Sequence, residues 1–169
     1  DRLRPQVAVL VLNANGDPAR FAGFGLPVAA DSVPDFAGPL AGVLAGLDWA
    51  AAHAPDCRYV ASAPTDAPFL PADLVVRLRQ ELEASGADLA CAASGGRAHP
   101  VCGLWPVRVR NDLRRAVIED GVRKVDLFTA RYRLVTVAFA DRPIDPFFNV
   151  NRPEDFAAAA SLLAASETA

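Results

Sequence analysis

Ser62-Ala63-Pro64-Thr65-Asp66-Ala67-Pro68 follows the apolar run Tyr59-Val60-Ala61. A β-branched and aromatic run that stops at two prolines is typical of a buried strand ending in a rigid turn. Such a turn would hold Asp66 at the carboxyl end of the strand, where open α/β sheets bind ligands. A carboxylate there is a candidate ligand for a hydrated divalent cation. Alternatively, Asp66 could cap the helix that begins near Pro71, or simply occupy a turn.

Strands and helices alternate outward from this stretch. Apolar runs or alternating patterns predict strands at 6–12, 27–30, 59–61, 88–93, 98–105 and 133–139. Helical spacing predicts helices at 40–51, 71–85, 106–120 and 122–128 and a last one from Pro153, with Phe156, Ala159, Ala160 and Leu163 in its core stripe. The tight turn 94–97 predicts a hairpin. This order predicts a three-layer α/β fold, a mostly parallel sheet with helices on both faces.

Composition limits the class of protein. The 169 residues are expected to form one domain over 1–169, and 52% hydrophobic and 22% charged residues are typical of a soluble globular chain. A net charge of -3 argues against nucleic-acid binding, which relies on clustered positive charge. No apolar run of about 18 residues is present to span a bilayer, so no membrane association and a cytoplasmic location are expected. Cys57, Cys91 and Cys102 lack metal-site spacing and are expected to be reduced and mostly buried.

Polar residues follow several of the predicted strands. Asn13, Asp31, Asp66 and Asn151 would all reach the carboxyl edge of a parallel sheet. Few acids and several neutral amides suit a polyphosphate nucleotide bound through one Mg²⁺, which needs only one or two protein carboxylates. Asn residues also serve as turn formers, and Asn151 could merely cap the last helix.

Other candidates are weaker. His99, which precedes Pro100, could be structural or could contact a substrate; metal binding is disfavoured because no second His or Cys stands at ligand spacing. Arg123 and Lys124 form a basic pair that could be solvated or could bind a phosphate-bearing ligand. Asn149 and Asn151 alternate, so they share one side of an extended segment.

Six strings in order resemble the molybdenum cofactor guanylyltransferases, a MobA-like nucleotidyltransferase family. They are Asn13-Ala14-Asn15, Asp31-Ser32, Gly38-Pro39-Leu40-Ala41-Gly42, Pro64-Thr65-Asp66-Ala67-Pro68, His99-Pro100 and Asn149-Val150-Asn151-Arg152-Pro153-Glu154-Asp155. The resemblance implies a Rossmann-like nucleotidyltransferase fold. It also implies Mg²⁺-dependent transfer of GMP from GTP to the phosphate of molybdenum-bearing molybdopterin, with release of pyrophosphate.

The resemblance also implies residue roles and partners. Asp66 would match the family's acid that binds Mg²⁺ and GTP, Asn13 and Asp31 would match GTP contacts, and Asn149 and Asn151 would match the asparagine pair near nucleotide and pterin. A molybdenum-insertion protein and molybdoenzyme chaperones would be further partners.

One part of the family pattern does not match. The family begins with a strand and a glycine-rich loop carrying a basic residue, followed by a lysine, and the only lysine here is Lys124. The chain also has no methionine. We therefore expect that a first strand and the phosphate-binding loop precede Asp1, and that the chain from Asp1 alone binds GTP poorly. Three alternatives stay open: a cytidylyltransferase for the same pterin, a sugar-phosphate nucleotidyltransferase, and a non-catalytic module that binds a pterin or a partner.

Overall fold

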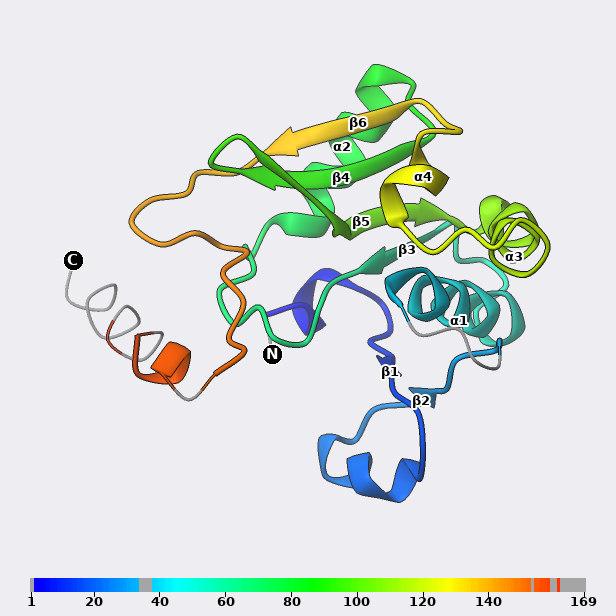
Figure 1. Ribbon diagram of the computed structural model, residues 1–169, viewed down its shortest axis with the longest axis horizontal. Helices are drawn as coiled ribbons and strands as arrows, with labels where there is room; N and C mark the ends of the chain where they lie inside the picture. The colour runs from blue at the N-terminus through cyan, green and yellow to red at the C-terminus, as the bar shows by residue number, and fades with distance from the viewer. Residues whose placement is uncertain (1, 34–37, 153, 159–160, 162–169) are drawn as a thin grey trace.

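The computed structural model describes residues 2–33, 38–152, 154–158 and 161 (Figure 1). Its main sheet has the strand order β3-β5-β4-β6, formed by β3 (Tyr59–Ser62), β4 (Leu89–Ser94), β5 (Arg97–Pro106) and β6 (Leu134–Ala138). β5 runs antiparallel to β3 and β4, whereas β6 is parallel to β4, so all strands except β5 share one direction. Gly95 and Gly96, with φ of 54° and 78°, form the predicted hairpin turn, because a two-residue turn with both φ positive matches the strand twist.

A separate two-stranded parallel pair carries the first polar residues. It consists of β1 (Leu12–Asn13) and β2 (Val28–Ala29), with the 3₁₀ segment η2 (Pro18–Phe24) between them. The predicted strand at 6–12 is therefore wrong over most of its length: its first residue belongs to the 3₁₀ turn η1 (Arg4–Gln6), and only its end joins a ladder. Within the described residues β1 pairs with β2 alone, and Val9 is 50% exposed. An apolar run forms a strand only where neighbours accept its backbone hydrogen bonds.

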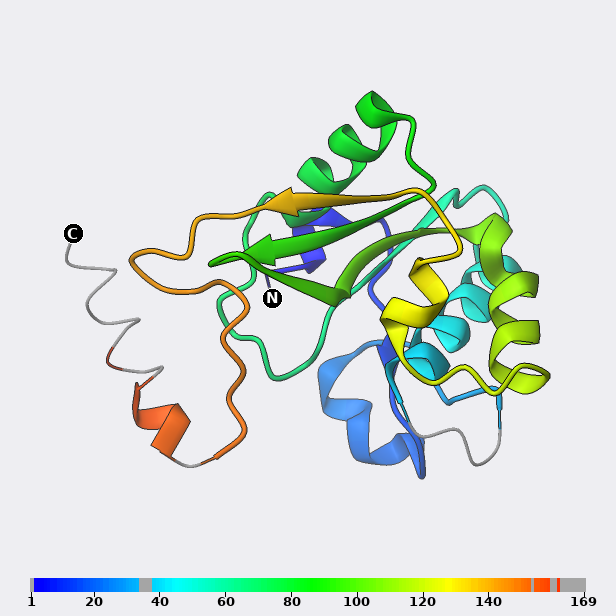
Figure 2. The same cartoon turned by 45° about the horizontal axis from the view of Figure 1, so that its top comes forward.

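The helices cover both faces of the main sheet, as predicted. α1 (Pro39–His53), α3 (Arg110–Ile118) and α4 (Val125–Thr129) pack on one face, and α2 (Leu74–Ser85) packs on the other (Figures 1 and 2). Side chains alternate along the strands, so Leu89 and Trp105 enter the first core while Ala90 and Leu104 enter the second. The expected three layers, and the α/β class, are confirmed.

Some predicted boundaries are wrong. The helix expected from Pro106 starts later, because Pro106 pairs with Tyr59 in the sheet and the 3₁₀ turn η3 (Val107–Val109) intervenes. The second helix starts at Leu74, not at Pro71. Residues 154–158 are helical, but Phe156 is 70% exposed and forms no core stripe, since helical spacing does not specify what covers it. Pro153, Ala159, Ala160 and Leu163 lie outside the described residues. No described helix is long and apolar enough to cross a membrane.

Candidate active site

The turn after β3 positions Asp66 so that one of its carboxylate oxygens is buried and accepts no hydrogen bond from the described residues. Ser62 anchors the strand end, since its hydroxyl donates to the carbonyl of Val101 at 2.6 Å and accepts from the indole of Trp105 at 2.8 Å. Oδ1 of Asp66 is buried and has no hydrogen-bond partner among the described residues. Asp66 therefore does not cap α2, whose N-cap position is occupied by Asp73.

The surroundings of Asp66 fit a cation with few protein ligands. Burying a carboxylate oxygen without a donor is unfavourable, and a bound cation would compensate it. The described residues contain no group of three or more His, Cys, Asp or Glu side chains that could hold a metal. Water and substrate phosphates would have to supply the other ligands, which is how Mg²⁺ is usually bound. Burial, with the nearby charge of Asp66, raises the pKa of the Cys102 thiol to about 12.

Asn13, Asn15 and Asp31 form a hydrogen-bonded cluster at the end of the β1–β2 pair. The side-chain amide of Asn13 donates to Oδ1 of Asp31 at 3.0 Å and to the carbonyl of Ala29 at 3.0 Å. The amide of Asn15 donates to Oδ2 of Asp31 at 2.8 Å, and its oxygen accepts from the backbone N–H of Asp31 at 2.8 Å. The structure thus brings Asn13 and Asp31 together as predicted, and adds Asn15.

Helix α1 supports this cluster from the side. A Cβ on Gly42 would lie 2.5 Å from Oδ1 of Asn13, so only glycine permits this approach. About one and a half turns further along α1, the carboxylate of Asp48 accepts a hydrogen bond from the hydroxyl of Ser32 at 2.7 Å and another from the guanidinium of Arg114 at 2.5 Å. The residue after Asp31 is therefore tied to α1 and α3.

His99 belongs to a second polar cluster, at the carboxyl end of β4. Its Nε2 lies 2.8 Å from the hydroxyl of Ser94, which donates to Oδ1 of Asp145 at 2.8 Å. The imidazole stacks on Phe147, with 4.6 Å between ring centroids. Burial lowers the pKa of His99 below its ordinary value, against the opposing effect of the Asp145 charge.

The segment after β6 connects this cluster to Asp66. The N–H of Val150 donates to the carbonyl of Asp66 at 2.8 Å, placing the flanking Asn149 and Asn151, both exposed, beside the turn. At the following helix start, the carboxylate of Asp155 accepts from the backbone N–H of Asn151 at 2.9 Å.

The predicted site residues thus comprise two hydrogen-bonded networks and the basic pair Arg123 and Lys124. One network holds Asn13 and Asp31; the other holds Asp66 and His99 through the 145–151 segment, and no hydrogen bond joins the two in the described chain. Arg123 and Lys124 precede α4 and are exposed, and the carbonyl of Arg123 lies 3.9 Å from the Cβ position of Gly38, at the start of α1. Sequence reasoning missed Ser94 and Asp145, since neither stands in a recognisable local pattern.

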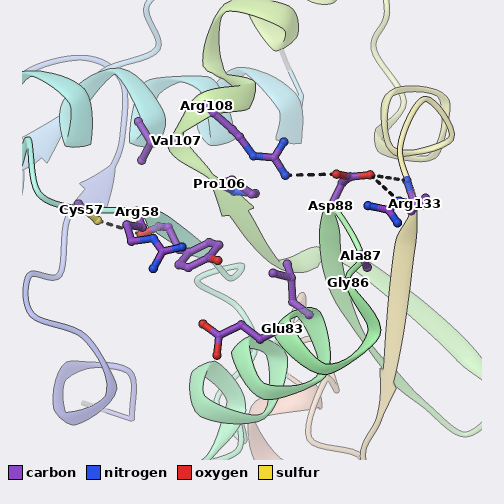
Figure 3. A pocket seen from close by; sticks show the side chains of 12 residues that line it. Cys57, Arg58, Glu83, Gly86, Ala87, Asp88, Pro106, Val107, Arg108 and Arg133 are labelled. Carbon is purple, nitrogen blue, oxygen red and sulfur yellow. Dashed lines mark hydrogen bonds and ion pairs between the residues drawn. The ribbon is translucent and has the colours of Figure 1, made fainter.

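A pocket of about 550 Å³ lies at the opposite edge of the sheet (Figure 3). It is lined by residues at the amino ends of β3, β4 and β6, which include Arg58 and Arg133, and by residues after the carboxyl end of β5, which include Arg108. Asp88 pairs with Arg108 at 3.2 Å and with Arg133 at 3.1 Å, and the hydrogen bond from Arg133 lowers the pKa of Asp88. Two of these arginines thus have a counter-ion within the pocket, which contains no residue predicted to be functional.

Comparison with known proteins shows consistent similarities. Residues 1–137 match the family model described as a MobA-like NTP transferase domain. A molybdenum cofactor guanylyltransferase from Rhodopseudomonas palustris strain BisB5 is 64% identical over 159 residues, which are 94% of this chain and 76% of that protein. One from Bradyrhizobium sp. strain ORS 278 is 59% identical over 163 residues, covering 96% of this chain and 77% of that protein.

Among solved structures, the molybdopterin-guanine dinucleotide biosynthesis protein A from Archaeoglobus fulgidus superposes with a TM-score of 0.67. The superposed region covers 91% of this chain and 78% of the Archaeoglobus fulgidus chain. At 21% identity, this likeness supports the fold.

Proposed function

The chain belongs to the MobA-like NTP transferase family and, within it, to the molybdenum cofactor guanylyltransferases, and from this premise we propose that it transfers GMP from GTP to molybdenum-bearing molybdopterin. An oxygen of the pterin phosphate attacks the α-phosphorus of GTP. A new P–O bond forms, the bond to the β-phosphate bridging oxygen breaks, and pyrophosphate leaves. The product is the guanine dinucleotide form of the molybdenum cofactor.

The observation that carries this proposal is the unpaired buried oxygen of Asp66 at the carboxyl end of β3. Because the attacking phosphate oxygen is already anionic, the reaction needs alignment and charge neutralisation more than a general base. Asp66 would bind Mg²⁺, which when bound neutralises charge on the phosphates of GTP. The role of the protein is then to hold two anionic substrates in line around one carboxylate.

The positions of the two networks favour a particular arrangement of the substrates. Figure 1 shows the β1–β2 pair beyond β3, on the side away from β5, and this pair carries Asn13 and Asp31. We assign the nucleotide to that side. The pterin would lie on the other side of Asp66, along the segment with Asn149 and Asn151.

The test compares Asp66→Asn with Asp73→Asn in the protein expressed from its complete reading frame. Asp73 is a matched control, since it precedes α2 in the same connection and its side chain is 56% exposed. GMP transfer from labelled GTP to molybdenum-molybdopterin should fall at least about 100-fold in Asp66→Asn, the scale of losing a preorganised charge-stabilising group. Asp73→Asn should behave as wild type.

Chelation and urea unfolding further test the metal assignment, and a comparison of GTP with CTP and UTP as donors separates the alternatives. Chelation by EDTA should abolish transfer, and added Mg²⁺ should restore it. Stability of Asp66→Asn to urea should stay within about 1 kcal/mol of wild type, because an unpaired turn carboxylate contributes little to packing. Full activity of Asp66→Asn would contradict the metal assignment. A preference for CTP or UTP would favour one of the other nucleotidyltransferases, and no transfer from any nucleotide would favour a binding module.

A further inference from the structure

The cluster of Ser94, His99 and Asp145 has a defined direction of proton donation. The hydroxyl of Ser94 carries one proton, and Oδ1 of Asp145, 2.8 Å away, is a carboxylate oxygen that can only accept. The proton of Ser94 is therefore directed to Asp145. The contact of 2.8 Å between Ser94 and Nε2 of His99 must then be donated by the imidazole, so Nε2 carries the proton.

This leaves Nδ1 of His99 as the free nitrogen. Nδ1 has no partner among the described residues, and it is not sealed off, since the only buried side-chain N or O atom without a partner in the described chain is Oδ1 of Asp66. A neutral imidazole protonated at Nε2 has an acceptor at Nδ1. The charged groups that act on the ring are Asp145 and Arg97: burial and the charge of Arg97 lower the pKa of His99, and the charge of Asp145 opposes them.

The position of the ring places this acceptor on one side of the candidate active site. His99 pairs with Ala92 on β4, two residues before the buried Ser94. Asp145 accepts from the N–H of Phe147 at 2.9 Å, and Phe147 stacks on His99. The same segment then reaches Val150, which bonds to Asp66. His99 is thus joined to the pterin side and not to the Asn13–Asp31 cluster.

We propose that Ser94 and Asp145 are positioning residues that fix His99 in the Nε2–H form, so that Nδ1 accepts a hydrogen bond from an N–H of the pterin ring. The proposal rests on the proposed function and adds a contact specific to the second substrate. A pterin offers ring and amino N–H donors, whereas its phosphate and dithiolene groups offer none. An imidazole acceptor would therefore recognise the pterin ring and not the phosphate or the dithiolene.

Direct observation of the tautomer is the first test. The 169-residue sequence contains two histidines, His53 and His99, and the test uses ¹⁵N-detected NMR of the protein from the complete reading frame. The ring signals of His99 are identified as those that persist in His53→Gln and disappear in His99→Gln. The ring of His99 should show a protonated Nε2 and an unprotonated Nδ1 near neutral pH. In Ser94→Ala both tautomers should appear. A protonated Nδ1 in the otherwise wild-type protein would overturn the role of Ser94 and Asp145.

Two variants of His99 then separate its two nitrogens in the transfer assay. His99→Gln keeps an amide donor toward Ser94 but has no acceptor at the Nδ1 position, and should raise the KM for molybdenum-molybdopterin about tenfold, the loss of one hydrogen bond. The KM for GTP should stay within about twofold. His99→Asn places an amide oxygen near the Nδ1 position and should lose less. His53→Gln is the control and should match wild type.

The outcomes are distinguishable. A wild-type KM for the pterin in His99→Gln, or equal rises in both KM values, would overturn the proposed contact. No GMP transfer by the wild-type protein would overturn the proposed function, while the NMR tautomer would still test the positioning by Ser94 and Asp145. If Ser94→Ala fails to fold, the two His99 variants and the wild-type tautomer decide.

Discussion

Replacement of Gly42 by alanine should weaken nucleotide binding and lower stability only modestly. The new Cβ would stand 2.5 Å from Oδ1 of Asn13, closer than real Cβ contacts, so the asparagine must move. Moving it breaks the hydrogen bonds of Asn13 to Ala29 and Asp31, at about 0.5–1.5 kcal/mol each. Alanine in a helix interior gains about 1 kcal/mol over glycine. The free energy of unfolding should therefore fall by about 0–2 kcal/mol.

Gly46, one turn further along α1, is the matched control. A Cβ there would lie 3.4 Å from Cγ1 of Val60, which is an ordinary contact. Gly46→Ala should thus gain about 1 kcal/mol in urea unfolding and keep its affinity for GTP. Calorimetric titration with GTP should show about tenfold weaker binding for Gly42→Ala, if Asn13 contributes one hydrogen bond to the nucleotide. Equal stabilisation and wild-type GTP affinity in both variants would refute the role assigned to Asn13 and Gly42.

Two further predictions concern titratable groups. A thiol-reactive dye should label Cys57 in the folded protein, whereas Cys91 and Cys102, both buried with raised thiol pKa values, should react only after unfolding; equal labelling of all three in the native state would contradict the burial. Since burial lowers the pKa of His99, the unfolded chain binds its proton at a higher pH than the folded chain does, so stability should fall as pH drops below about 6.5. Urea unfolding of wild type and His99→Gln between about pH 5 and 7.5 checks this, because the variant should lack that part of the slope.

Much of the fold could be predicted from local signals. The two glycines after β4 predict the hairpin because they adopt positive φ, and the proline-framed turn at Asp66 predicts where β3 ends. The apolar spacing of α1 and α2 predicts which helix faces are buried. These features depend on residues close in sequence, so the sequence is sufficient to place them.

The remaining features depend on what lies beside a segment. The run at 7–11 has the composition of a strand, but no strand among the residues that the structure describes pairs with it. Phe156 has helical spacing but is 70% exposed. The contact between Ser94 and Asp145 spans 51 positions and follows no motif, so only the folded chain reveals it.

The single hydrogen bond from Val150 to the carbonyl of Asp66 has a thermodynamic consequence for substrate binding. It joins the turn proposed to hold the metal and GTP to the segment proposed to hold the pterin. If a bound nucleotide restricts the turn, this bond would restrict the pterin segment as well, and binding of the two substrates would then be linked. Such linkage is reciprocal: if GTP raises the affinity for the pterin by some factor, the pterin raises the affinity for GTP by that same factor.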